Sequence, residues 1–240
     1  MLPILQAHCQ DCHHAGVPEA PFSLVTYQEA VDHSEMIAEV VGEQRMPPWY
    51  ATKGHGNFTN VRRMSDEERA LIEDWVKSDC QQGDPAKAPK PREFSTAKWK
   101  IGEPDMVLTM AEPFTIPADG DDVYRCFVIP IDLEKDMMVS AVEFRPGNRA
   151  VVHHAIMFLD ATGAGRKRDA EDEQQGFVSF GGPGIKPTGG LGGWAPGAMP
   201  RVLPDGIVKY LKKGSDLVLQ IHYHPSGKQE QDQSTVGIYF

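Results

Sequence analysis

Residues 151–159 are Val-Val-His-His-Ala-Ile-Met-Phe-Leu, and residues 217–223 are Leu-Val-Leu-Gln-Ile-His-Tyr. Both runs are rich in β-branched, aliphatic and aromatic residues, and Gly or Pro lies close to each, which is typical of strands. Further runs of this kind occupy 106–110, 123–131, 139–144 and 235–239. The pattern predicts an antiparallel, jelly-roll-like β sandwich over residues 104–240. Residues 160–200, rich in Gly, Pro and charge, are expected to form a long loop.

The first 84 residues have a different pattern. Thr26 with Glu29, and Ser65 with Glu68, fit the capping box that begins a helix. Apolar residues then recur at helical spacing between positions 71 and 76. A Pro- and Lys-rich stretch follows, which predicts a linker over residues 85–103. We therefore expect a multi-domain α + β chain, in which a small all-α domain (1–84) precedes the sandwich.

Composition excludes several classes of protein. The chain has 240 residues and a formal net charge of −10, which argues against a nucleic-acid partner. We also expect no membrane span, because no run approaches 18 apolar residues. Four cysteines are too few for a disulfide framework. The pairing of Cys80 with Cys126 stays open, although we expect Cys126 to be a buried free thiol and Cys80 to lie near the surface.

The sequence Cys9-Gln10-Asp11-Cys12-His13 matches the motif for covalent attachment of c-type haem. Two thiols at this spacing can reach the two vinyl groups of one porphyrin, and His13 then lies beneath the iron as an axial ligand. A zinc knuckle or a redox cysteine pair is the alternative. Met46, between Arg45 and two prolines, is the expected sixth ligand because Met/His ligation suits electron-transfer cytochromes. The competing candidates are Met36, Met64 and His33.

Two histidine clusters form a second constellation. Adjacent side chains on a strand point to opposite faces, so His153 and His154 can serve one metal only at a strand end or a bulge. His222 and His224, two residues apart, share a face on a regular strand. Imidazole suits Cu, Zn, Fe and Ni, so these residues predict a metal without identifying it. A zinc hydrolase would need a nearby general base, and no Asp or Glu lies inside these motifs.

The first 84 residues resemble the class I cytochrome c domains that are fused to copper proteins in environmental bacteria. The likeness lies in the haem motif, in Ala20-Pro21-Phe22-Ser23-Leu24, in Arg45-Met46-Pro47-Pro48-Trp49 and in Ser65-Asp66-Glu67-Glu68. Such domains mature outside the cytoplasm, so the resemblance implies a periplasmic or otherwise extracytoplasmic protein. Met1-Leu-Pro-Ile-Leu lacks the features of a signal peptide, and we therefore expect the chain to lack its original N-terminus.

Residues 104–240 resemble the first domain of the copper type II, ascorbate-dependent monooxygenases, such as the peptidylglycine α-hydroxylating and dopamine β-monooxygenases. The likeness lies in residues 124–127, 151–158, 198–206 and 217–223. It implies that His153, His154 and His222 bind an electron-transfer copper. His224 departs from the family pattern, which leaves three interpretations: an exposed residue, an accessory ligand, or part of another metal site. The family's second copper domain would follow Phe240, so the chain is expected to be truncated there.

These resemblances imply an extracytoplasmic redox protein in which haem c exchanges electrons with a three-His copper site. Its partner would be an electron donor or acceptor protein or a small reductant, and the full-length protein would take a small-molecule substrate. The enzyme assignment stays open between part of a copper-dependent monooxygenase and a non-catalytic electron-transfer or metal-binding module. The sequence does not define the substrate, the reductant or the oligomeric state.

Overall fold

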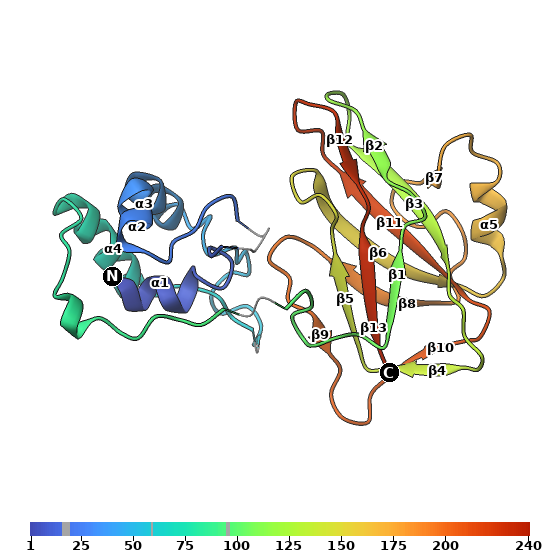
Figure 1. Ribbon diagram of the computed structural model, residues 1–240, viewed down its shortest axis with the longest axis horizontal. Helices are drawn as coiled ribbons and strands as arrows, with labels where there is room; N and C mark the ends of the chain where they lie inside the picture. The colour runs from blue at the N-terminus through green and yellow to red at the C-terminus, as the bar shows by residue number, and fades with distance from the viewer. Residues whose placement is uncertain (16–19, 59, 95–96) are drawn as a thin grey trace. The chain divides into compact units, whose positions relative to one another are not determined.

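A computed structural model describes residues 1–240 except 16–19, 59 and 95–96 (Figure 1). The chain forms two compact units, Met1–Thr96 and Ala97–Phe240, called here the N-terminal unit and the β unit. This division falls inside the predicted linker, 85–103. Residues 16–19 and 59 of the predicted helical domain, and 95–96 of the predicted linker, lie outside the described residues.

The described part of the N-terminal unit contains short helices joined by long irregular segments. They are α1 (Leu2–His8), α2 (Tyr27–Asp32), α3 (Ser34–Gly42), α4 (Asp66–Lys77) and the 3-10 turn η1 (Pro85–Lys87). Both predicted capping boxes are present, since Thr26 caps α2 with Glu29 and Ser65 caps α4 with Glu68. The helices pack around one small apolar cluster: Ile4, Leu5, Leu24, Ala30, Ile37, Val41, Met64 and Ile72.

The predicted fold class is wrong. Most of the regular structure is β strand, in several antiparallel sheets, and helices occupy only 18% of the chain. A small all-α class I cytochrome c domain is not seen in the part of the chain that the structure describes. The physical reason is the length of the helices: α1, α2 and α3 have 7, 6 and 9 residues, below the length at which a helix is stable without tertiary packing. The described residues between 43 and 65 form no helix at all.

The β unit contains all of the described strands. They are β1 (Met106–Thr109), β2 (Phe114–Ile116), β3 (Val123–Pro130), β4 (Met137–Val139), β5 (Ala141–Arg145), β6 (Val152–Asp160), β7 (Phe177–Val178), β8 (Gly189–Trp194), β9 (Arg201–Val202), β10 (Lys209–Leu211), β11 (Asp216–Tyr223), β12 (Glu230–Asp232) and β13 (Thr235–Tyr239), with helix α5 (Ala164–Asp169) after β6. The expected loop at 160–200 is thus wrong in part, because α5, β7 and β8 fall within it.

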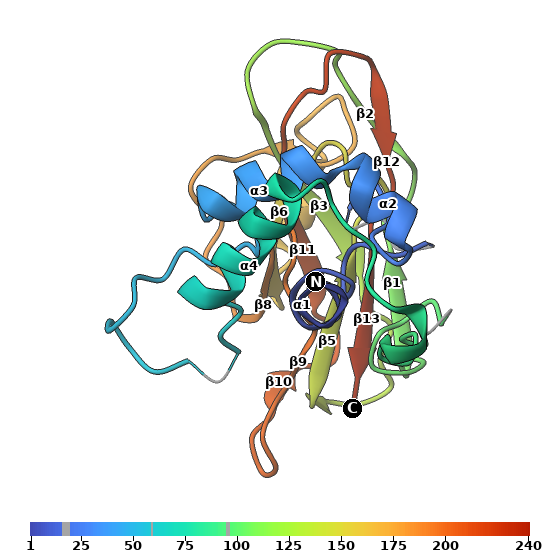
Figure 2. The same cartoon turned by 90° about the vertical axis from the view of Figure 1, so that its left-hand side faces the viewer.

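Two larger sheets carry the architecture of the β unit. One has the strand order β1-β13-β5-β9, and the other has the order β7-β3-β11-β6-β8 (Figure 1; Figure 2). Two small sheets, β10-β4 and β12-β2, complete the unit. Apolar side chains from both larger sheets form one core, in which Leu108, Phe144 and Val236 of the first join Phe127 and Leu219 of the second. All the pairings are antiparallel.

Strand β11 is central in the five-stranded sheet, and each of its eight residues is buried. Leu217, Leu219, Ile221 and Tyr223 belong to the main core. Because strand side chains alternate, the even-numbered residues project from the opposite face. There Val218 packs with Cys126 and Phe177 in a smaller cluster. His222 follows on this second face, near the end of the strand.

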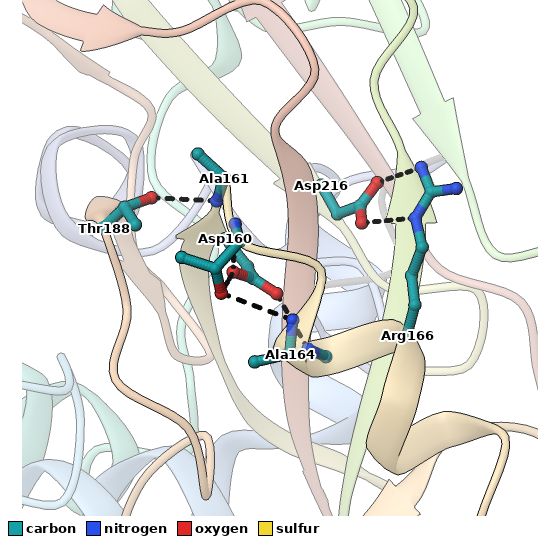
Figure 3. A network of polar contacts seen from close by, with 8 residues as sticks. Asp160, Ala161, Ala164, Arg166, Thr188 and Asp216 are labelled. Atoms are coloured by element: carbon teal, nitrogen blue, oxygen red, sulfur yellow. Dashed lines mark hydrogen bonds and ion pairs between the residues drawn. The ribbon is translucent and has the colours of Figure 1, made fainter.

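A polar network anchors the other end of the β6–β11 pair (Figure 3). Asp160 and Asp216 face each other in register there. The Asp160 carboxylate accepts a hydrogen bond from the Gly165 amide at 2.7 Å, which fixes the start of α5. Arg166 of α5 donates two hydrogen bonds of 2.6 Å to Asp216. This network ties α5 to the sheet and lies six residues along β11 from His222, about 20 Å at strand spacing.

Among the described residues, no helix is long and apolar enough to cross a membrane.

Candidate metal centre and haem-attachment motif

The two adjacent histidines lie at a bulge at the beginning of β6. His154 pairs with His222, whereas Tyr223 pairs with Val152, so the register shifts by one residue between them. His153 is therefore the extra residue of a β-bulge, where the local bend re-aims a side chain. The strand alternation that would separate His153 from His154 is broken at this position. A bulge is one of the two positions, with a strand end, at which one metal can reach both rings.

The structure brings His153, His154 and His222 together at the end of β6 and β11. One ring nitrogen from each residue lies within 4.8 Å of the others. The Nδ1 atom of His154 is 3.2 Å from Nδ1 of His153 and 3.2 Å from Nδ1 of His222. The pKa of His154 is lowered by burial and by its two histidine neighbours. A neutral imidazole is the form that binds a metal, so this environment favours coordination.

Tyr124 completes a row of rings across three strands. Tyr124 on β3 pairs with His222 on β11, and His222 pairs with His154 on β6. The Tyr124 ring stacks on the His222 ring, with centroids 4.2 Å apart and an angle of 11° between the planes. Phe180, an exposed residue, contacts the Tyr124 ring edge to face, with centroids 4.8 Å apart. The His222 ring therefore has one face covered by an aromatic side chain.

The sequence analysis missed Asp122. Its carboxylate lies 2.7 Å from Nε2 of His222 and 2.7 Å from Nδ1 of His224, one contact through each oxygen. These hydrogen bonds, from His224 first and then His222, lower the pKa of Asp122. Asp122 directly precedes β3, which pairs with β11, so a correct strand pairing would have brought it to His222. The sequence offers no other signal, because Asp119 and Asp121 lie in the same turn.

His224 is not one of the three clustered residues. Its side chain is 71% exposed, and its Nδ1 donates a hydrogen bond to Asp122. Its backbone amide donates to the carbonyl of Val151 at 2.8 Å, just beyond the end of β11. His224 is therefore an exposed residue with a carboxylate partner.

The haem motif lies after α1. Cys9 and Cys12 are partly buried and form no disulfide, and burial together with Cys12 raises the pKa of Cys9 to about 12. Nδ1 of His13 lies 3.1 Å from the carbonyl of Phe22 and donates a hydrogen bond to it. Burial is the main cause that lowers the pKa of His13, and a lower pKa favours the neutral ring. Its Nε2 atom has no hydrogen-bond partner among the described residues and is available to bind iron.

The expected sixth ligand lies at a cavity of about 490 Å³ in the N-terminal unit. Met46, which is 43% exposed, lines it together with buried Met64. Trp49 lines it too, and its buried indole Nε1 has no hydrogen-bond partner among the described residues. The residues that line the cavity fall within 41–53 and 63–69. Cys9, Cys12 and His13 are not among them. Met46 and the haem-attachment motif therefore do not line the same cavity among the described residues.

The other candidates for that ligand lie elsewhere. His33 donates through Nδ1 to the carbonyl of Glu29 at 2.9 Å, and its ring stacks on Phe22 at 4.0 Å. Phe22 also contacts the ring of His13, with centroids 4.8 Å apart. Met36 is exposed on α3.

The two remaining cysteines are both free and buried. Cys126 has no exposed surface, as expected, and burial raises the pKa of its thiol to about 12. The expectation that Cys80 lies near the surface is wrong, since it is only 8% exposed. It follows α4, where its carbonyl accepts a hydrogen bond from the hydroxyl of Tyr27. Cys80 and Cys126 belong to different units.

Comparison with known proteins gives no match: neither a family model, nor a curated protein, nor a solved structure matches this chain.

Proposed function

We propose that this chain is an extracytoplasmic redox protein that holds one copper ion at His153, His154 and His222 and haem c in its N-terminal unit. The observation that carries the proposal is the convergence of three Nδ1 atoms, with two separations of 3.2 Å, at a β-bulge. Three imidazoles without a fixed fourth ligand would hold Cu(I) and Cu(II) with little rearrangement, so bound copper would supply one-electron transfer.

The position of Asp122 favours an electron-transfer site over a zinc hydrolase. A hydrolase needs a general base close to the water on its metal. Asp122 is the acidic residue that contacts the cluster, but it binds Nε2 of His222, the nitrogen on the far side of the ring from Nδ1. Both of its oxygens are engaged by histidines. It is therefore placed to orient a ligand and not to activate a water molecule.

The residues of the N-terminal unit fit haem c. Cys9 and Cys12 would form the two thioether bonds, and His13 would bind the iron through Nε2. The hydrogen bond from its Nδ1 to Phe22 fixes the tautomer and the ring orientation that such ligation needs. The cavity beside Met46, where the buried Trp49 Nε1 has no hydrogen-bond partner among the described residues, is not lined by Cys9, Cys12 or His13, so it adds no support for Met46 as the sixth ligand. Attachment of haem to these cysteines would take place outside the cytoplasm.

Metal content tests both halves of the proposal. The chain is expressed in a periplasm with c-type haem maturation, and iron, copper and zinc are measured per polypeptide. We expect one iron and one copper. Cys12→Ala should lower the haem content and leave copper unchanged, whereas His154→Ala should remove copper and leave the haem intact. Each variant is thus the control for the other.

Electron exchange is tested in the loaded protein. After rapid reduction of the haem, its absorption bands should return to the oxidised form at a rate that does not depend on protein concentration. His154→Ala should abolish that phase. Iron with zinc in place of copper, or a haem that copper does not oxidise, would contradict the proposal. Hydroxylation of a substrate would require an oxygen-activating copper in addition to this electron-transfer site.

A further inference from the structure

Asp122 lies behind the three-His cluster, outside the set of metal ligands. We infer that Asp122, held in place by His224, is a positioning residue that fixes His222 for metal binding through Nδ1 and favours the oxidised metal. This inference rests on the proposed copper site. It gives His224 a role that does not require a second metal.

The hydrogen bond decides which nitrogen of His222 faces the cluster. An ionised carboxylate only accepts hydrogen bonds, so Nε2 of His222 must carry the proton that it donates to Asp122 at 2.7 Å. The neutral ring then has its lone pair on Nδ1, the atom that lies 3.2 Å from Nδ1 of His154. The 7% exposure of the His222 side chain leaves water little access to compete for that proton.

The stacking of Tyr124 restricts the remaining motion of the ring. With one face covered at 4.2 Å, the ring can keep its plane and still turn by 180° about its bond to Cβ. Such a turn would replace Nδ1 by a carbon atom in the cluster. It would also break the hydrogen bond to Asp122, because Nε2 would move away. Asp122 therefore selects one of the two orientations that the stacking allows.

His224 holds the carboxylate itself. Asp122 is 38% exposed, and a side chain with that much exposure could rotate into water. The Nδ1–H group of His224 donates to Oδ1 while His222 donates to Oδ2, so both oxygens are fixed. The backbone of His224 is anchored in turn by its hydrogen bond to Val151, next to the bulge. His222, Asp122 and His224 thus form one chain of contacts.

A carboxylate behind an imidazole also makes the ring a better electron donor to its metal. This effect, and the negative charge itself, stabilise Cu(II) more than Cu(I). A residue that only held the fold would affect both oxidation states alike. The ratio of the two affinities therefore separates a positioning role from a structural one.

The test compares Asp122→Asn, His224→Phe and Asp136→Asn in the full chain with haem attached. Asp136 is the matched control, since it is also an exposed aspartate with both carboxylate oxygens engaged, in its case by the Tyr210 hydroxyl and the Lys213 backbone amide. Dissociation constants for Cu(II) and Cu(I) are measured by competition with chelators, and circular dichroism verifies folding.

We expect Asp122→Asn to weaken Cu(II) binding about 10- to 100-fold, with a smaller change for Cu(I). Each factor of ten between the two losses raises the reduction potential of copper by about 59 mV. His224→Phe should have a smaller effect in the same direction, and Asp136→Asn none. Equal losses for both oxidation states, or no loss, would overturn the inference while the copper site stands. A wild-type protein that binds no copper would overturn the proposed function and this inference with it.

Discussion

Asp232 is a buried carboxyl group in the β unit, only 1% exposed. It accepts hydrogen bonds from the hydroxyls of Tyr223 and Ser234, at 2.8 Å each, and from the amide of Asn148. Burial is the largest influence and raises the pKa of Asp232 despite these donors. Asp136, exposed at the surface, shows the opposite: the hydroxyl of Tyr210 is the main cause that lowers its pKa.

The contributions of Asp232 and Asp136 to the stability of the folded state should therefore change with pH in opposite directions. A raised pKa in the folded state means that the contribution of Asp232 to stability is full below its ordinary value of 3.8 and is lost as pH rises through the folded pKa. The contribution of Asp136 is full above 3.8 and is lost as pH falls through its lowered pKa. Urea unfolding of wild type, Asp232→Asn and Asp136→Asn between about pH 3 and 7 measures both. Differences from wild type that change in the same direction with pH would contradict this assignment.

The residues of the candidate metal site show what a sequence can and cannot predict. The set His153, His154 and His222 was predicted from the resemblance to the copper monooxygenases, and strand alternation added only that His153 and His154 need a bulge or a strand end to share a metal. Asp122 was not, since its contact with His222 depends on the pairing of β3 with β11, 100 residues apart in the chain. The location of the bulge likewise depends on the register between β6 and β11.

At the scale of elements, α4 is the longest of the described helices, with 12 residues. Ser65 begins it, and its hydroxyl accepts a hydrogen bond from the amide of Glu68 at 3.1 Å. Ile72 on this helix is fully buried in the core of the N-terminal unit. Because the core of this unit is small, we expect the start of α4 to contribute a large share of its stability.

Ser65→Ala should lower the free energy of unfolding of the N-terminal unit by about 1 kcal/mol, because it leaves an amide at the helix start without an acceptor. Ser78→Ala, at the other end of α4, is the control. The Ser78 hydroxyl donates to carbonyls of Asp74 and Trp75, which also remain accessible to water, so its loss should cost less. Thermal unfolding followed by circular dichroism at 222 nm gives both values. An effect of Ser78→Ala as large as that of Ser65→Ala would contradict the capping argument.

The elements differ in how far the sequence predicted them. The runs at 123–131 and 235–239 became β3 and β13 almost residue for residue, since both are long or sharply bounded by turns. Strand β8 (Gly189–Trp194) was missed because four of its six residues are glycine, a poor strand former that only pairing with β6 holds extended. In the N-terminal unit, the capping boxes predicted two helix starts, but local signals did not define how the helices assemble.

At the scale of the whole molecule, each unit has its own apolar core and its own buried thiol. Cys80 lies in the N-terminal unit and Cys126 in the β unit. Both side chains are inaccessible in the folded protein, at 8% and 0% exposure. Alkylation of each cysteine, resolved by mass spectrometry of its peptide, therefore reports the unfolding of the unit that contains it.

Metal binding should stabilise only the β unit, so only the free energy of unfolding measured at Cys126 should rise. All three clustered histidines belong to the β unit, so a metal that binds the folded site adds its binding free energy to that unit alone. Zn²⁺ serves as a probe that does not oxidise thiols, and at 100 times its dissociation constant it should raise the free energy of unfolding at Cys126 by about 2.7 kcal/mol. The value at Cys80 should not change. His154→Ala should remove the effect, which excludes binding at other groups as its cause. An unchanged value at Cys126 would contradict the three-His site, because a preformed cluster that binds metal must resist unfolding more strongly when the metal is present.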